Sequence, residues 1–123
     1  MTQRGFSMNP DFPYLGHIRD ALLDIRAFVE GMAYEDFLRD KRTQNAVMRS
    51  FEIVGEASRR LSREFRAANP QLPWRKMMDF RNKLLHDYFG LDLFLVWQTA
   101  VNDAPPLLPL IEALGVDNPR KRS

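Results

Sequence analysis

The stretch FRNKLLHDYFG, residues Phe80–Gly90, lies between segments that have the regular apolar spacing of amphipathic helices. Within eight positions it brings together a permanent cation, an amide, a titratable base and a phenol: Arg81, Asn82, His86 and Tyr88. We expect the rest of the chain to fold as the helices that hold this stretch.

Composition limits the chemistry available to the chain. With 123 residues, 45% hydrophobic and 28% charged, it has the size and composition of one globular domain. The absence of cysteine excludes disulfides, thiolate nucleophiles and cysteine-bound zinc or iron–sulfur clusters. The two histidines, His17 and His86, provide few candidate ligands for a metal ion, so we expect neither a metal nor a cofactor.

The termini and the net charge constrain the function less than the composition does. No apolar run approaches the roughly 20 residues of a membrane-spanning helix, and residues 1–14 lack the apolar core of a signal peptide, so we expect a cytoplasmic protein. We expect a flexible leader over 1–10, one helical domain over 11–114 and a basic tail over 115–123. The net charge of +2 permits contact with nucleic acid, although a solvated surface is the simpler interpretation of arginines spread along the chain.

Alternating spacings of three and four between apolar residues predict a first long helix, from Asp11 or Pro13 to about Gly31. Its apolar stripe consists of Leu15, Ile18, Leu22, Ile25 and Val29. Its charged residues, which include Arg19, are expected on the solvent side. His17 lies next to the stripe, where a surface or partly buried histidine is favoured over a catalytic one.

The same spacing predicts a second long helix from about Thr43 to Ala67, which stops before Asn69-Pro70 because the residue before proline disfavours helical geometry. Its apolar stripe consists of Val47, Phe51, Val54, Ser58, Leu61 and Phe65. Small residues, among them Gly55, would let another helix approach closely. Glu52 and Glu56 share one face and are available to pair with an arginine; solvated glutamates are the simpler alternative.

Shorter elements complete the expected architecture. Pro73 is suited to the first position of a helix that begins near Trp74 and leads into the central stretch. Asp92 is a good N-cap for the next helix, and Pro105-Pro106 must break it before a short terminal helix over 107–114. Since no segment has a strand pattern, the sequence predicts an all-α fold, an antiparallel bundle of four to five helices.

A helical wheel divides the polar residues of the central stretch. With about 100° of rotation per residue around the helix axis, Asn82 lies at about 100° from Arg81, His86 at about 140° and Tyr88 at about 340°. If the helix continues, Arg81 and His86 are also separated by about 7.5 Å along its axis. One straight helix therefore does not direct both side chains at one atom. Either the helix ends or bends before His86, or a second copy of the chain in a twofold dimer supplies the missing group.

These residue types suit the cleavage of RNA. Histidine exchanges protons near neutral pH, and arginine offers a permanent charge with a fork of donors that matches phosphate oxygens. The 2′-hydroxyl of RNA attacks the adjacent phosphorus once a base removes its proton, so neither a metal nor a protein nucleophile is required. Tyr88 is able to stack on a base, bind a phosphate or accept a modification. The structural alternative is that the helix dipole favours a protonated histidine at a helix C-terminus.

The central stretch resembles a known family. The string RNKLLHDY, residues Arg81–Tyr88, matches the R-x-x-x-x-H-x-Y motif of the HepT-like toxins, which belong to the HEPN superfamily of helical ribonucleases. The similarity includes the segments FEIVGEASRRLSREFR (Phe51–Arg66), NPQLPWRKMMDFRN (Asn69–Asn82) and HDYFGLDLFLVW (His86–Trp97). It covers most of the chain, from Tyr14 to Leu114.

The resemblance implies a helical bundle of HEPN type that dimerises, with the motifs of both protomers lining a shared cleft. It implies an endoribonuclease in which Arg81 and His86 are the catalytic pair and Asn82 supports them. It also implies the toxin of a type VII-like toxin–antitoxin pair, in which a small nucleotidyltransferase antitoxin of the MntA type transfers adenylyl groups to Tyr88. The expected partners are RNA, this antitoxin and a second copy of the chain.

An alternative keeps the fold and removes the catalysis. In it the chain is a non-catalytic helical subunit of a minimal nucleotidyltransferase, which binds nucleotide or presents Tyr88 for modification. The two hypotheses differ in whether the purified protein cuts RNA.

Overall fold

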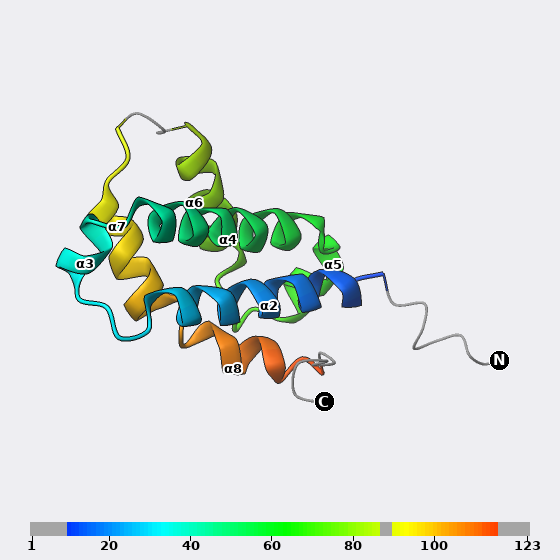
Figure 1. Ribbon diagram of the computed structural model, residues 1–123. Coiled ribbons are helices and arrows are strands. Elements are labelled where there is room, and N and C mark those ends of the chain that lie inside the picture. Colours follow the sequence, from blue (N-terminus) through cyan, green and yellow to red (C-terminus); the bar gives the residue numbers. More distant parts are fainter. Residues whose placement is uncertain (1–9, 87–89, 116–123) are drawn as a thin grey trace.

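The computed structural model describes residues 10–86 and 90–115, and all regular elements in these ranges are helical (Figure 1). Three helices are long: α2 (Phe12–Val29), α4 (Lys41–Arg60) and α6 (Trp74–His86). The shorter ones are α3 (Tyr34–Leu38), α5 (Arg63–Ala68), α7 (Leu93–Gln98), the π-helix η1 (Thr99–Asp103) and α8 (Leu107–Glu112). The predicted all-α fold is confirmed.

Some predictions fall on residues outside the described ranges. They concern the leader, apart from Pro10, the basic tail, apart from Gly115, and Tyr88. None of the helices in the described ranges combines the length and the apolar character that a membrane span requires.

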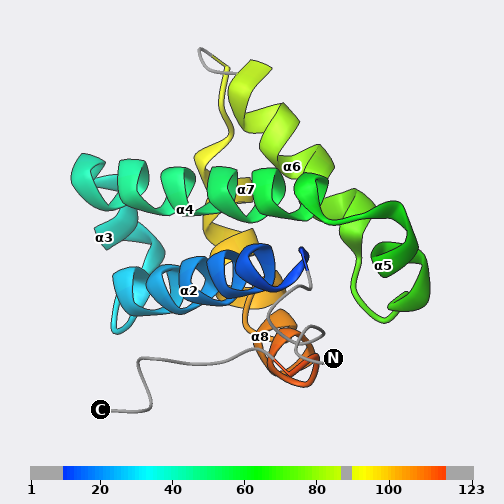
Figure 2. The same ribbon diagram turned by 90° about the vertical axis from the view of Figure 1, so that its right-hand side faces the viewer.

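The helices α2 and α4 lie side by side, run in opposite directions and form the centre of the fold (Figures 1 and 2). The helix α6 packs on the other side of α4, and α8 packs on the other side of α2 (Figure 2). Both predicted stripes face this core. The residues of the two stripes that are buried are Leu15, Ile18, Leu22, Ile25, Val29, Val47, Phe51, Val54, Ser58 and Leu61.

The predicted solvent face of α2 is wrong at Arg19. This side chain is 1% exposed, and its Nε donates a hydrogen bond of 3.0 Å to the Asp20 carboxylate. Besides α4, the helices α8 and η1 also pack against α2. The buried surface of α2 is therefore wider than the single apolar stripe that the spacing indicated.

The second long helix is shorter than predicted, because α4 ends at Arg60 and a separate helix, α5, follows. Leu61 and Ser62 have extended backbone angles, with ψ of 148° and 152°. The Ser62 hydroxyl caps α5 by accepting a hydrogen bond from the Phe65 amide at 3.1 Å. The Asp11 carboxylate accepts from the Ser62 amide at 2.8 Å. This contact comes from the distant start of α2, so apolar spacing did not reveal the break.

Of the remaining helix boundaries, the starts after Asp92 and after the two prolines agree with the prediction, whereas α7 ends earlier than expected, at Gln98. Asp92 caps α7, since its carboxylate accepts hydrogen bonds from the amides of Phe94 and Leu95 at 3.0 and 3.2 Å. The unexpected π-helix η1 ends at Asp103, directly before the break at Pro105-Pro106. The short helix α8 follows the two prolines as expected.

Gly55 brings α4 and α6 close together. A Cβ built on Gly55 would overlap the Cβ of Arg81 and would lie 3.0 Å from the carbonyl oxygen of Met77. Beside this contact the rings of Phe51 and Phe80 meet edge to face, with centroids 4.9 Å apart. The predicted close approach is confirmed at Gly55, and it fixes the backbone of Arg81 against α4.

Candidate active site

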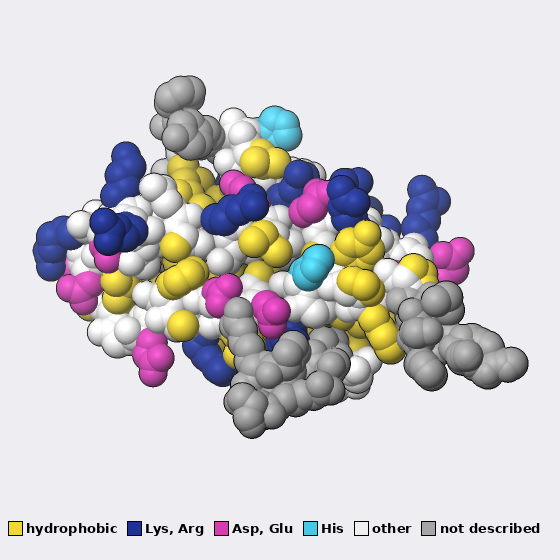
Figure 3. Space-filling model, turned by 45° about the vertical axis from the view of Figure 1, so that its right-hand side comes forward, with side chains coloured by type: hydrophobic (Ala, Val, Ile, Leu, Met, Phe, Trp, Pro, Cys, Tyr) yellow, Lys and Arg dark blue, Asp and Glu magenta, His cyan; other side chains and the backbone are white. Residues whose placement is uncertain are grey.

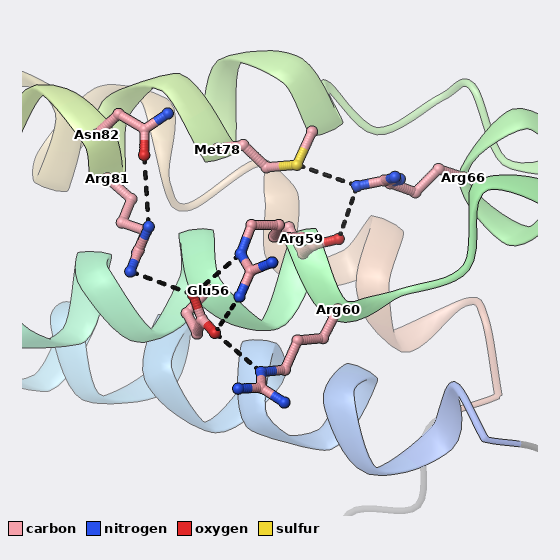
Figure 4. A network of polar contacts seen from close by, with 8 residues as sticks. Glu56, Arg59, Arg60, Arg66, Met78, Arg81 and Asn82 are labelled. Atoms are coloured by element: carbon pink, nitrogen blue, oxygen red, sulfur yellow. Dashed lines mark hydrogen bonds and ion pairs between the residues drawn. The ribbon is translucent and has the colours of Figure 1, made fainter.

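Arg81 is directed toward α4, where the carboxylate of Glu56 binds its guanidinium (Figure 4). The Arg81 Nη2 lies 3.2 Å from Glu56 Oε1, and the Arg81 side chain remains 26% exposed. Glu52 pairs with Arg49 instead, at 3.7 Å. Of the alternatives that the sequence left open, pairing with an arginine is therefore correct for both glutamates, and only Glu56 holds Arg81.

Glu56 is shared by three arginines. Besides Arg81, it accepts hydrogen bonds from Arg59 Nη2 and Arg60 Nε, each at 2.8 Å (Figure 4). The hydrogen bonds from Arg59 and then Arg60 lower the pKa of Glu56 to about 2, and the charge of Arg81 acts in the same direction. Because this pKa lies below the ordinary value, the carboxylate is charged at any pH well above about 2. One carboxylate among three guanidiniums leaves net positive charge beside Arg81, which favours a phosphate.

Asn82 contacts both of the predicted catalytic residues. Its side-chain oxygen accepts a long hydrogen bond from Arg81 Nη1 at 3.4 Å, and its main-chain oxygen lies 2.8 Å from His86 Nδ1. A carbonyl oxygen only accepts hydrogen bonds, so Nδ1 carries the proton and Nε2 of the neutral ring presents a lone pair. His86 is exposed, so this lone pair is open to an incoming hydroxyl group.

The helix α6 is continuous from Trp74 through His86, so an end of the helix before His86 is excluded and, of the first alternative raised by the helical wheel, only a bend remains. Arg81 packs against α4, whereas His86 is exposed at the end of α6, which projects beyond α4 (Figures 1 and 2). Leu85, next to His86, is 47% exposed. The other alternative, a site completed by a second copy of the chain, stays a prediction.

The last predicted site residue, Tyr88, lies outside the described residues, so its role also stays a prediction. In residues 10–86 and 90–115 no three acidic or histidine side chains are grouped as metal ligands.

A groove of about 400 Å³ opens beside Arg81, between α2, α4 and α6. Its walls include Tyr14 and His17 from α2, Arg49 and Arg60 from α4, and Arg81 and Leu85 from α6. On this face, Lys and Arg side chains lie between the two histidines, with acidic side chains among them (Figure 3). His17 is exposed, as predicted, whereas the groove that Tyr14 and His17 line was not predicted. Their spacing of three residues, which places them on one helix face, was the available signal.

An all-helical domain that presents a guanidinium and an imidazole on one helix offers the side chains that phosphodiester cleavage uses. Comparison with known proteins is more specific. The family model Ribonuclease HepT-like matches residues 18–114. The chain therefore belongs to the HepT-like ribonuclease family, which confirms the predicted family and the ribonuclease class.

Individual relatives agree with the family model. A protein of Thermococcus cleftensis named "Probable ribonuclease HepT" is 44% identical over 101 residues, which cover 82% of this chain and 92% of the relative. A protein of Methanocaldococcus jannaschii, provisionally named an RNase, is 39% identical over 101 residues, or 82% of this chain and 84% of the relative. Another, from Caldanaerobacter subterraneus subsp. tengcongensis and named in the same way, is 38% identical over 95 residues, or 77% and 85%. No solved structure shows a significant match.

Proposed function

We propose that the protein is a metal-independent endoribonuclease in which Arg81 and His86 catalyse the cleavage. The observation that supports this most strongly is that α6 carries both an anchored guanidinium and a histidine whose Nε2 is free to act as a base. The histidine tautomer and the charge of Arg81 match the two needs of the reaction, a proton acceptor and a cation for the phosphate.

In this mechanism His86 Nε2 removes the proton of the 2′-hydroxyl. The 2′-oxygen forms a bond to phosphorus while the bond from phosphorus to the 5′-oxygen breaks. Arg81, held by Glu56 at 3.2 Å, compensates the negative charge that develops on the phosphorane oxygens. The products are a 2′,3′-cyclic phosphate and a 5′-hydroxyl, and the leaving 5′-oxygen takes its proton from water.

The histidine that acts on the phosphate bound by Arg81 would come from another copy of this chain. The proposed homodimer brings together the projecting ends of α6, so that Arg81 of one copy and His86 of the other act on one phosphate. The separation of the two side chains along a continuous helix supports this arrangement, as does the exposure of Leu85 beside His86. A twofold axis at this position would place two motifs in one cleft.

Cleavage of a mixed-sequence single-stranded RNA in excess chelator tests the proposed reaction. We expect the wild-type protein to cut at the same rate with and without EDTA, because no step uses a metal. End-group analysis should find 2′,3′-cyclic phosphate or its hydrolysis product on one fragment and 5′-hydroxyl on the other. Activity that disappears in EDTA and returns with a divalent ion would refute the metal-free mechanism, and a 5′-phosphate product would refute attack by the 2′-hydroxyl.

We further propose that the protein is the toxin of a type VII-like toxin–antitoxin pair and that a minimal nucleotidyltransferase of the MntA type neutralises it by adenylylation of Tyr88. The phenol of Tyr88 lies two positions beyond His86 in the sequence. An adenylate there would add a phosphate charge and a bulky nucleoside next to the catalytic base. Either effect would prevent RNA from reaching His86.

Intact-mass measurement after co-expression with such a nucleotidyltransferase tests the modification. The wild-type chain should gain the mass of one or more adenylates, and the Tyr88→Phe variant should gain none while it remains toxic to the host. Tyr14→Phe and Tyr34→Phe are matched controls, because they remove the other two tyrosines and should leave the mass shift intact. A mass shift that persists in Tyr88→Phe would move the modification to another residue.

A further inference from the structure

The groove between α2, α4 and α6 has the composition of a site for single-stranded nucleic acid. Its lining includes the apolar Ile53 and Ala57, and also the carboxylates of Glu52 and Glu56. One end carries two rings from α2, Tyr14 and His17, which meet edge to face with centroids 6.0 Å apart and an interplanar angle of 83°. Single-stranded RNA is bound by aromatic rings that contact bases together with cations that contact phosphates.

Cations line the same groove and connect it to Arg81. Arg60 donates a hydrogen bond of 2.8 Å to Glu56. This contact, with the nearby Tyr14 hydroxyl, raises the pKa of the Arg60 guanidinium. Glu56 in turn binds Arg81. Polar contacts therefore join Arg60 through Glu56 to the proposed catalytic arginine on α6, and Tyr14 of α2 lines the same groove beside them. Arg49 lies on the same wall, with 73% of its side chain exposed.

We infer that this groove is the subsite for a nucleotide of single-stranded RNA adjacent to the phosphate that Arg81 binds. Tyr14 and His17 contact the base, and Arg49 contacts a flanking phosphate. The volume of about 400 Å³ is within the range of sites that hold small organic molecules. Because this role presupposes the proposed function, the test below separates binding in the groove from cleavage at His86.

Binding is measured by fluorescence anisotropy with a short labelled single-stranded RNA, in EDTA, on the non-cleaving His86→Ala background. Tyr14→Ala should weaken binding by about 5- to 150-fold, the loss expected for one stacked base. Tyr14→Phe keeps the ring and should bind within about twofold of the parent, since it loses only the hydroxyl group. Phe28→Ala, an aromatic residue of α2 that is 39% exposed and does not line the groove, should have no effect.

Arg49→Gln and Arg39→Gln form a matched pair. Arg49 is 73% exposed and pairs with Glu52 at 3.7 Å, while Arg39 is 74% exposed and pairs with Asp36 at 3.6 Å on α3. Only Arg49→Gln should weaken RNA binding, and it should reduce the slope of log affinity against log salt by about 0.7, the value for one lost phosphate contact to a single strand. Equal effects of the two variants would mean that the groove does not bind phosphate.

The outcomes distinguish the groove from the catalytic proposal. If Tyr14→Ala and Arg49→Gln bind and cut RNA as the wild type does, the groove inference is wrong and the catalytic proposal stands. If the wild type cuts no RNA but these variants still lose affinity, the groove binds RNA and the catalytic proposal is wrong. If the variants change the molecular mass in light scattering while RNA affinity is unchanged, the groove is a protein interface, and the inference is overturned.

Discussion

Replacing His86 with alanine should abolish RNA cleavage without unfolding the protein. Loss of a general base lowers a reaction rate by about 100- to 10,000-fold. The helix α6 carries no second histidine that could replace His86. The side chain is exposed and its one hydrogen bond is to the main chain of its own helix, so the melting temperature should change by no more than about 2 °C.

Rate measurements on a small set of variants check this prediction. Lys76→Ala, at an exposed position on the same helix, is the matched control and should cut RNA as the wild type does. Arg81→Lys keeps the positive charge but loses the planar fork of donors, so its rate should fall as well. If His86→Ala cuts as fast as the wild type after identical purification, the activity belongs to a contaminant or to another residue.

Replacing Gly55 with alanine should have the second largest effect, on both stability and activity. The added methyl group would occupy the space of the Arg81 Cβ, so α6 must move away from α4. Overpacking of this kind costs about 1–3 kcal/mol, or a fall of several degrees in the melting temperature. The movement also carries the guanidinium of Arg81 away from Glu56, so we expect cleavage to slow by at least about tenfold.

Gly16→Ala is the control for a glycine-to-alanine change in a helix where the added methyl group meets no neighbouring helix. A Cβ on Gly16 meets no atom within 4 Å. Inside a helix such as α2, alanine is more favourable than glycine by about 1 kcal/mol. This variant should be as stable as the wild type or slightly more stable, and equally active. Thermal denaturation and the cleavage assay measure both variants, and a Gly55→Ala protein with wild-type stability and rate would show that close packing at Gly55 does not position Arg81.

Much of the fold was predictable because helices are encoded locally. The stripes Leu15–Val29 and Val47–Leu61 were recognised from spacing alone, and both are buried. The cap at Asp92 and the break at Pro105-Pro106 depend on single residues with strong backbone preferences, and both are present.

The errors arose where distant segments decide the structure. The break between α4 and α5 depends on Asp11, which binds Ser62 from the start of another helix. Arg19 is buried although it lies outside the apolar stripe, and α8 and η1 also pack against α2. Apolar spacing reports one face of one helix, so it indicated neither contact.

Some features of the candidate site were likewise predictable from the sequence, and others depend on contacts between distant segments. The motif residues and the separation of Arg81 from His86 were recognised from the sequence and a helical wheel. The sharing of Glu56 among three arginines required the packing of α6 on α4 at Gly55. The groove required α2 as well, because Tyr14 and His17 are more than 60 positions away from Arg81 in the sequence.

The central claim is that Arg81 of one copy and His86 of another cleave RNA together. Co-expression of an Arg81→Ala chain and a His86→Ala chain with different affinity tags, followed by purification through both tags, isolates the mixed dimer. Each variant alone should be inactive, whereas the mixed dimer keeps one intact pair and should recover up to about half of the wild-type rate in EDTA. A mixed dimer as inactive as either variant alone would contradict a site shared between two chains.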